Sequence, residues 1–268
     1  MHLEFGSPSS PLFLNQYAAG RLFQYEIRIG LGETDIFGRL RFDALARIAQ
    51  DIAGADLEDS GLDGEGVWIL RRTGLRINTD VTYGSRLQVS TFCSGVGRSW
   101  ASRRTVVKDG AITVADVASL WIQTDPETRA PKSLSDNFME VYGVSADGRK
   151  VSTRLSATAL EENFTKEIDW SFRFCDFDLI GHVNNVSYLY PLEEVLSATY
   201  GDRLAESRPT IDVIIEYRDG INVGSTYKVK ANSEDKLNLD FYSGERLGAT
   251  IRAFKKGKIA YSPQSLLG

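Results

Sequence analysis

Two stretches of the chain run from an alternating pattern of apolar and polar residues into a helical pattern. The alternation predicts strands at 25–29 and at 168–174. Beyond the first strand, the apolar residues that share one helical face are Leu45, Ile48, Ala49, Ile52 and Ala53. Beyond the second they are Tyr188, Leu192, Val195 and Leu196. Pro191 lies inside this second pattern, where it is expected to kink the helix or to mark its fresh start.

A short motif between strand and helix also occurs twice. Residues 33–38 and 176–181 share the order acid-x-acid-x-x-Gly at a shift of 143 positions, and residues 84–89 resemble 224–229 at a shift of 140. Strand patterns follow at 87–94, 100–108 and 114–124 in the first copy, and at 227–232, 237–242 and 249–255 in the second. The chain is therefore predicted to be an α+β protein of two copies, each a long helix packed on an antiparallel sheet.

Length and composition fit this duplication. The 268 residues, 42% of them apolar, suffice for two cores. We expect a flexible leader at 1–20, a first domain at 21–140, a linker at 141–165 and a second domain at 166–262. No apolar run reaches the roughly 18 residues of a membrane span, and the leader lacks the pattern of a signal peptide.

Charge and the rare residue types disfavour several classes of function. A formal net charge of -5 argues against binding to nucleic acid or anionic lipid. The two cysteines, Cys93 and Cys175, lie far apart without a C-x-x-C motif, which argues against a disulfide framework and fits a reducing cytoplasm. The two histidines are His2 and His182, so no multi-histidine metal site is expected, and no cofactor is predicted.

Polar chemistry concentrates between positions 176 and 185, where a strand pattern gives way to a helix. The segment holds Asp176, Asp178, His182, Asn184 and Asn185. Free backbone N–H groups at a helix start can stabilise an oxyanion that develops on a reacting carbonyl. A histidine four residues after a carboxylate can orient or activate a water molecule. Structural roles stay open as well, because Asn184 could cap the helix and Asp176 could cap a turn.

The first copy provides an internal comparison for this segment. It keeps Asp35 at the position of Asp178, but it has Arg39 where the second copy has His182. Arg41 and Phe42 likewise replace Asn184 and Asn185. A single active site, in the second copy, is the natural interpretation. The first copy is then expected to contribute a scaffold and part of a substrate pocket.

The quoted residues resemble the acyl-ACP thioesterases, enzymes that release fatty acids from acyl carrier protein (ACP). Residues 181–188, Gly-His-Val-Asn-Asn-Val-Ser-Tyr, follow Asp176-Phe177-Asp178 as in that family's signature. Residues 66–72 are similar to its Gly-x-x-Trp-x-x-x-x-Arg stretch, and 119–122 to its Ser-x-Trp strand. The segment 209–218, which ends Glu216-Tyr217-Arg218, is similar to its Glu-Tyr-Arg strand. The resemblance covers about residues 21–255.

The resemblance implies a fold, a reaction and site residues. The fold is two tandem hotdog repeats, each an antiparallel sheet wrapped around a long central helix. The reaction is hydrolysis of acyl-ACP, with Asp178, His182 and Glu216 acting on water. The implied substrate-binding residues are Asn184, Asn185, Ile180 and Trp68. Ile180 departs from the family's Asp-x-Asn-x-His run, in which this position is an amide. Glu216 could instead form a surface ion pair.

The resemblance implies acyl carrier protein as partner, without a cofactor or metal. Because carrier proteins are acidic, a basic surface is expected, with Arg71 and Arg72 as candidates beside Arg98, Arg103 and Arg104. An acyl-CoA thioesterase and a non-catalytic acyl- or ACP-binding hotdog protein are the alternatives. Cys175 is disfavoured as a nucleophile because no second histidine could serve it. The chain could be a monomer or a homodimer.

Overall fold

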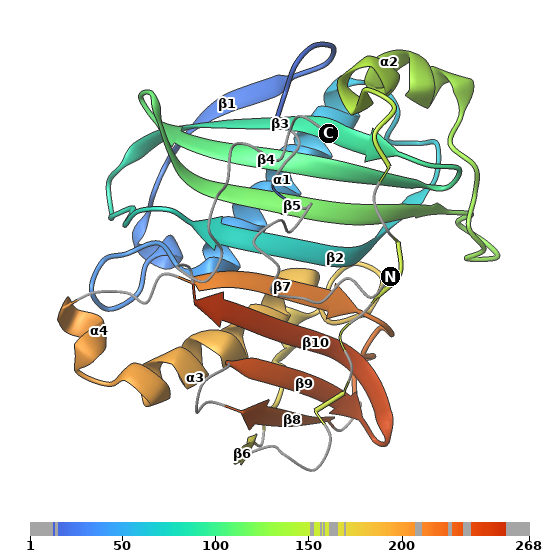
Figure 1. Cartoon of the computed structure of the whole chain (residues 1–268). Coiled ribbons are helices and arrows are strands. Elements are labelled where there is room, and N and C mark those ends of the chain that lie inside the picture. The colour runs from blue at the N-terminus through green and yellow to red at the C-terminus, as the bar shows by residue number, and fades with distance from the viewer. Residues whose placement is uncertain are drawn as a thin grey trace, which may run out of the picture.

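The computed structural model describes most of the chain. The described residues are 13, 16–150, 153–155, 157, 159–160, 166–168, 170–206, 211–224, 227–232 and 237–255. In this part of the chain, ten strands form one antiparallel sheet in the order β1-β3-β4-β5-β2-β7-β10-β9-β8-β6 (Figure 1).

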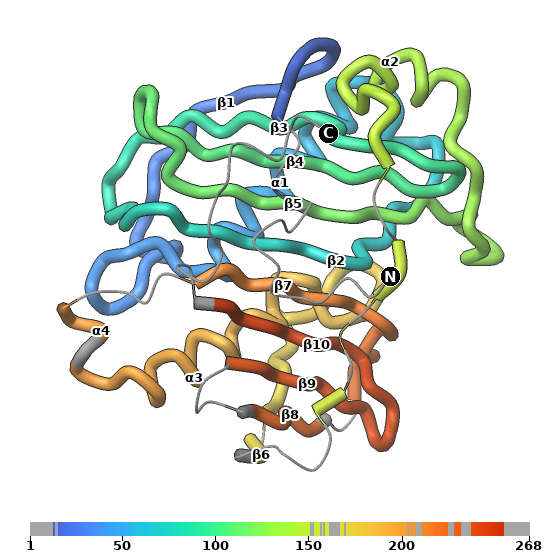
Figure 2. The backbone as a smooth tube through the Cα atoms, in the orientation of Figure 1, coloured from blue at the N-terminus to red at the C-terminus, as the bar shows by residue number. Residues whose placement is uncertain are grey.

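Each copy contributes one half of the sheet. The first copy consists of β1 (Phe23–Arg28), η2 (Leu31–Glu33), α1 (Phe42–Asp59), β2 (Val67–Ile77), β3 (Arg86–Val96), β4 (Trp100–Asp109) and β5 (Ile112–Thr124). The second consists of β6 (Lys166–Ile168), η3 (Phe174–Asp176), η4 (Asn185–Leu189), α3 (Tyr190–Tyr200), α4 (Arg203–Glu206), β7 (Ile211–Tyr217), β8 (Tyr227–Asn232), β9 (Asn238–Ser243) and β10 (Arg246–Lys255). The strand order of the second half reverses that of the first, so β2 and β7 meet at a pseudo-twofold junction (Figure 2).

One apolar core runs beneath both halves of the sheet. Leu45 and Ile52 of α1 and Leu192 and Leu196 of α3 are buried in it, which confirms the predicted apolar face of each helix. Helix α1 crosses behind β3, β4 and β5 in Figure 1. Fully burying one such aliphatic side chain stabilises the fold by about 1.5–3 kcal/mol. The two predicted hotdog repeats are therefore present and share a continuous core.

The second helix begins afresh at the proline, as predicted. A short 3-10 turn, η4, precedes α3, and Pro191 lies in the first turn of α3. Proline is tolerated there because the first amides of a helix have no intrahelical acceptor. The strand prediction at 168–174 is wrong over most of its length, since β6 ends at Ile168 and residues 170–174 carry no strand. The other predicted strands agree with β1, β3–β5 and β8–β10 to within a few residues.

The predicted linker begins inside a helix, α2 (Asp136–Ala146). Ser135 caps this helix, because its side chain accepts a hydrogen bond from Phe138 N at 2.9 Å. Phe138, Tyr142 and Ala146 repeat at a spacing of four residues and are buried beside β3, so the segment belongs to the first unit. The described residues at 153–155, 157 and 159–160 carry no helix or strand.

The predicted flexible leader is anchored at Phe13. This side chain is buried, with its ring 4.4 Å from the Arg76 guanidinium carbon and 5.4 Å from that of Arg104. Tyr17 makes an edge contact with Phe92 at a centroid distance of 5.6 Å. The rest of the predicted leader before residue 16 lies outside the described residues. Among the helices described, none has the length and apolar character needed to cross a bilayer.

Candidate active site

Asp178 is fixed by a tight turn between η3 and η4. Its Oδ1 accepts hydrogen bonds from Ile180 N at 3.0 Å and from His182 N at 3.2 Å. Its own N–H donates to His182 O at 2.8 Å. Gly181 has a φ of 77°, a left-handed conformation that glycine adopts without a Cβ penalty. The turn therefore leaves Oδ2 as the outward oxygen of the carboxylate.

The first copy builds the same turn around Asp35. Its Oδ1 accepts from Phe37 N and Arg39 N, both at 2.9 Å, and Gly38 has a φ of 76°. The two copies differ at Oδ2. In the first copy this oxygen accepts a hydrogen bond from Arg39 Nε at 3.1 Å, whereas no described residue donates to Asp178 Oδ2. The second copy therefore presents a carboxylate oxygen that the first copy neutralises.

The imidazole of His182 lies against the backbone of Gly220. A Cβ placed on Gly220 would stand 2.7 Å from His182 Nδ1, so only glycine leaves room for the ring in this position. Because Phe177 pairs with Val183 in an antiparallel bridge, Asp178 and His182 are directly opposite and share one face of the turn. His182 is half-buried beside the cavity wall that Asp178 forms.

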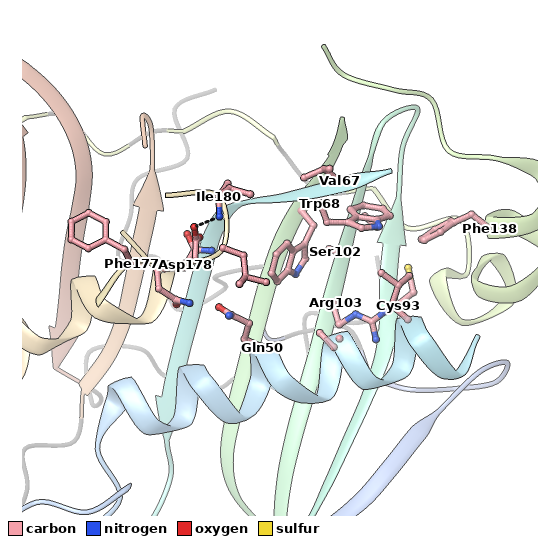
Figure 3. A pocket seen from close by; sticks show the side chains of 18 residues that line it. Gln50, Val67, Trp68, Cys93, Ser102, Arg103, Phe138, Phe177, Asp178 and Ile180 are labelled. Carbon is pink, nitrogen blue, oxygen red and sulfur yellow. Dashed lines mark hydrogen bonds between the residues drawn. The ribbon is translucent and has the colours of Figure 1, made fainter. Parts of the chain in front are cut away.

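An apolar cavity of about 620 Å³ extends from Asp178 along α1. Helix α1 contributes Gln50, Ala53, Gly54 and Leu57 to its wall. In Figure 3, Phe177, Asp178 and Ile180 stand at one end, Gln50 in the middle, and Trp68, Cys93 and Phe138 toward the other end. The cavity therefore lies inside the first copy, and residues 177–185 of the second copy close its mouth.

Small residues on α1 explain why the cavity lies in the first copy. Ala53 and Gly54 line it, and a Cβ added to Gly54 would meet nothing within 4 Å. At the same shift of 143, the second copy has Leu196 and Ser197. Tyr188 also fills the second core, with its ring 5.2 Å from that of Phe241. A glycine inside a helix costs roughly 0.5–1 kcal/mol relative to alanine. The open space beside Gly54 in the cavity is a reason for a glycine at this position despite that cost.

The predicted substrate-binding residues gather at this cavity. Trp68, Ile180, Asn184 and Asn185 all line it. Asn184 also caps η4, since its Oδ1 accepts from Val186 N at 3.1 Å. Asp176 is buried and caps the preceding turn through Arg173 N at 2.8 Å, which is the structural role foreseen for it. The backbone of Ile180, not its side chain, holds Asp178, so the missing family amide does not disturb the turn.

The structure does not bring Glu216 to this site. Residues 211, 213, 215 and 217 of β7 face the main core, so Glu216 projects from the opposite face of the sheet. It is 1% exposed and lies 3.8 Å from Arg72 Nη1 and 3.5 Å from Arg218 Nη2. Its Oε2 also accepts from Ala157 N at 3.1 Å. The geometry fits an ion pair, but a buried one and not the surface pair foreseen, while the cavity lies on the helix-covered face.

Three of the five arginines suggested for a carrier-binding surface are largely buried, so they cannot form such a surface. Arg72 is buried against Glu216, and Arg104 is buried between Asp116 and the carbonyl oxygen of Phe13. Arg103 points into the cavity wall and pairs with Asp56. Arg71 is half-buried, and its Nη1 donates to Arg218 O at 3.0 Å. Burial and the neighbouring Arg218 lower the pKa of Arg71. Arg98 alone of the five is exposed.

Sequence reasoning missed the residues that shape the cavity. Gln50 and Gly54 lie outside the apolar face predicted for α1, so the periodicity of that face contained no signal for them. Phe138 was assigned to the first domain without a role, yet it closes the far end of the cavity from α2. Its position depends on the docking of α2 on β3, which no local pattern specifies.

Two helix-on-sheet units, with an apolar cavity in the first and a carboxylate at its mouth, define a double-hotdog protein suited to a chain-like apolar ligand. A family model described as the acyl-ACP thioesterase N-terminal domain matches residues 20–142. The model of the acyl-ACP thioesterase C-terminal domain matches residues 158–256. The chain belongs to the acyl-ACP thioesterase family and is a thioester hydrolase.

Individual relatives agree with this assignment. An uncharacterized protein of Mycobacterium tuberculosis is 23% identical over 239 residues, which cover 88% of this chain and 93% of that protein. The palmitoyl-acyl carrier protein thioesterase of Arabidopsis thaliana is 21% identical over 243 residues, 81% of this chain and 58% of the plant protein. The 12:0-ACP thioesterase from Umbellularia californica shares the fold, with a TM-score of 0.70 at 18% identity over 89% of this chain and 98% of that one.

Proposed function

We propose that this protein hydrolyses fatty acyl-ACP to a free fatty acid and ACP, with a water molecule activated by Asp178. One observation carries the assignment: Asp178 lies at the mouth of an apolar cavity and has one oxygen fixed by two backbone amides. The other oxygen can accept a proton, which its counterpart in the first copy cannot do while Arg39 occupies it. Free cysteines at 93 and 175 support a reducing, cytoplasmic setting.

The chemistry follows from where the acyl chain would lie. With the chain in the cavity, the thioester carbonyl stands at the mouth beside Asp178. A water molecule gives a proton to Asp178 Oδ2 and forms the new C–O bond, and the negative charge collects on the carbonyl oxygen. The C–S bond then breaks, and the departing thiolate sulfur takes the proton from Asp178. The products are a fatty acid and a free thiol, so no cofactor is needed.

Two neighbouring groups would support this step. Asn185 lines the cavity mouth, and no described residue accepts a hydrogen bond from its backbone N–H. It is our candidate donor to the carbonyl oxygen. His182 shares the face of the turn on which Asp178 projects. We assign His182 to positioning the attacking water, with Gly220 setting the place of its imidazole.

The first experiment is thiol release from acyl-ACPs of several chain lengths, measured beside the matching acyl-CoAs. Both substrates carry the same phosphopantetheine arm, so a higher kcat/KM for acyl-ACP would isolate the contribution of the carrier. An equal or higher kcat/KM for acyl-CoA would identify the protein as an acyl-CoA thioesterase instead. Binding of acyl-ACP with no thiol release from either series would overturn hydrolysis and leave a binding protein.

Gly220→Ala tests the positioning role of His182. The added methyl would stand 2.7 Å from Nδ1, so the imidazole must turn away. We expect kcat for thiol release to fall about 100-fold, the scale of a 1 Å misplacement. Stability should change by less than about 1 kcal/mol, because the half-buried ring can move. Gly32→Ala, where an added Cβ meets nothing, is the matched control. An unchanged kcat for Gly220→Ala would remove His182 from the mechanism.

Gly54→Leu tests the cavity as the acyl site. The new side chain would project into the cavity midway along α1 and shorten it. We expect kcat/KM for long acyl chains to fall at least about tenfold while short chains are still cleaved. The melting temperature should rise slightly, because leucine favours a helix more than glycine. Gly54→Ala serves as the conservative control, and an unaltered chain-length profile in Gly54→Leu would place the acyl chain elsewhere.

A further inference from the structure

The wall of the cavity carries a polar band between its apolar ends. Gln50 projects from α1 and Arg103 from β4, and both line the lumen (Figure 3). A site for a purely hydrocarbon chain gains nothing from such groups, because each polar group deprived of water and partner costs free energy.

Gln50 gives the stronger indication of a polar ligand. Its Oε1 is buried and accepts no hydrogen bond from any described residue. A buried acceptor without a donor destabilises the fold. Neighbouring wall positions on α1 are Ala53, Gly54 and Leu57, so an apolar residue would suit the helix equally well. A ligand in the cavity that carries a hydrogen-bond donor would satisfy this amide oxygen.

Arg103 adds donors without adding net charge. Its guanidinium pairs with Asp56 and stacks over the ring of Tyr142, at 5.3 Å from the centroid. Asp56 also accepts from Arg21 Nε at 2.7 Å and from the hydroxyl of Tyr142 at 3.0 Å. The five N–H groups of an arginine exceed the acceptors that Asp56, Thr91 and Tyr142 offer. The side chain is 11% exposed, and it lines the lumen.

We propose that the cavity selects fatty acyl chains bearing a hydroxyl group within the chain, with the hydroxyl donating to Gln50 Oε1. This rests on the proposed function and names its substrate class. A hydroxyl supplies the donor that Gln50 Oε1 lacks, and Arg103 adds polar N–H groups elsewhere on the cavity wall. A keto group lacks the donor that Gln50 requires. A carboxylate would bring charge to a guanidinium already paired with Asp56.

The test compares ACP thioesters of one chain length, either saturated, hydroxylated at successive internal carbons, or carrying a keto group at those carbons. For the wild type, we expect one hydroxylated position to exceed both the saturated and the keto chain in kcat/KM by at least about tenfold, the value of one hydrogen bond. Preference for the saturated chain over every hydroxylated isomer would overturn the proposal.

Gln50→Met keeps the size of the side chain and removes the amide. The ratio of kcat/KM for the preferred hydroxylated chain to that for the saturated chain should fall about tenfold. Gln88→Met, at an exposed position on β3, is the control and should keep the wild-type ratio. An unchanged ratio in Gln50→Met would overturn the role of Gln50.

Binding of the free fatty acids separates this proposal from hydrolysis itself. Displacement of a bound fluorescent fatty acid gives a dissociation constant for the saturated acid and for the hydroxylated acid. The ratio of these two constants measures the selectivity without any hydrolysis. If no thioester is cleaved but the hydroxylated acid binds more tightly and loses its advantage in Gln50→Met, the selectivity holds and the enzymatic assignment fails. If thioesters are cleaved and the two acids bind equally, hydrolysis holds and the selectivity is wrong.

Discussion

Asp178→Asn is expected to lower kcat for thiol release by at least about 1,000-fold, the scale of losing a catalytic acid–base group. The substitution is nearly isosteric. The asparagine Oδ1 can still accept from Ile180 N and His182 N, so the turn keeps its geometry. Only the basic oxygen that faces the cavity is lost. Thiol release in single turnover measures the chemical step, and equilibrium binding of acyl-ACP shows that the substrate is still held.

The duplicated turn supplies a matched control for this experiment. Asp35→Asn makes the same change in the first copy, where both backbone bonds to Oδ1 are also present. It additionally weakens a partly exposed ion pair with Arg39, which costs up to about 1 kcal/mol of stability. We expect its kcat to match that of the wild type. Comparable losses in the two variants would show that the turn matters only for folding, and full activity in Asp178→Asn would exclude Asp178 as the base.

The duplication and the position of the active turn could be predicted because their signals are local. The acid-x-acid-x-x-Gly motif specifies its own hydrogen bonds, and its glycine is required where φ is about 77°. The restart of α3 likewise follows from Pro191 alone. Asp178 and His182 stood out because the first copy has Arg39 where the second has histidine. The same comparison now explains why only one copy leaves a carboxylate oxygen available.

The partners of the turn could not be predicted in the same way, because they depend on which face of the sheet is covered. Alternation along β7 places Glu216 on one face with Asp212, but it does not reveal that the other face carries the cavity. The prediction that Glu216 acts on water therefore does not fit the structure. The cavity also depends on the packing of α2 and of residues 177–185 against α1, which are distant in sequence.

At the junction of the two copies, the first copy has arginine at positions where the second copy has acids. In the ladder of β2 and β7, Arg72 faces Glu216 and Arg76 faces Asp212. At the shift of 140, residue 72 corresponds to 212 and residue 76 to 216. The first copy therefore carries arginine at both positions and the second copy an acid at both. Two first copies, or two second copies, would set like charges opposite each other.

Arg76→Met is expected to destabilise the protein by about 3–5 kcal/mol, because it leaves Asp212 buried without its partner. In the wild type, Arg76 Nε lies 2.7 Å from Asp212 Oδ1 and Nη2 lies 2.5 Å from Oδ2, and both side chains are less than 10% exposed. Guanidinium denaturation should show a lower midpoint with an unchanged m-value. Kinetic constants of the folded fraction should stay close to wild type, since the pair lies on the face opposite the cavity.

The double variant Arg76→Met with Asp212→Leu decides whether the cost comes from the lone charge. Replacing a buried ion pair by apolar residues is often neutral, so the second substitution should restore most of the lost stability. Lys228→Met, which breaks the largely exposed pair with Glu167, should cost less than about 1 kcal/mol and serves as the surface control. If the double variant is as unstable as Arg76→Met, the packing of Arg76 against Phe13 accounts for the loss, and charge complementarity does not hold the two copies together.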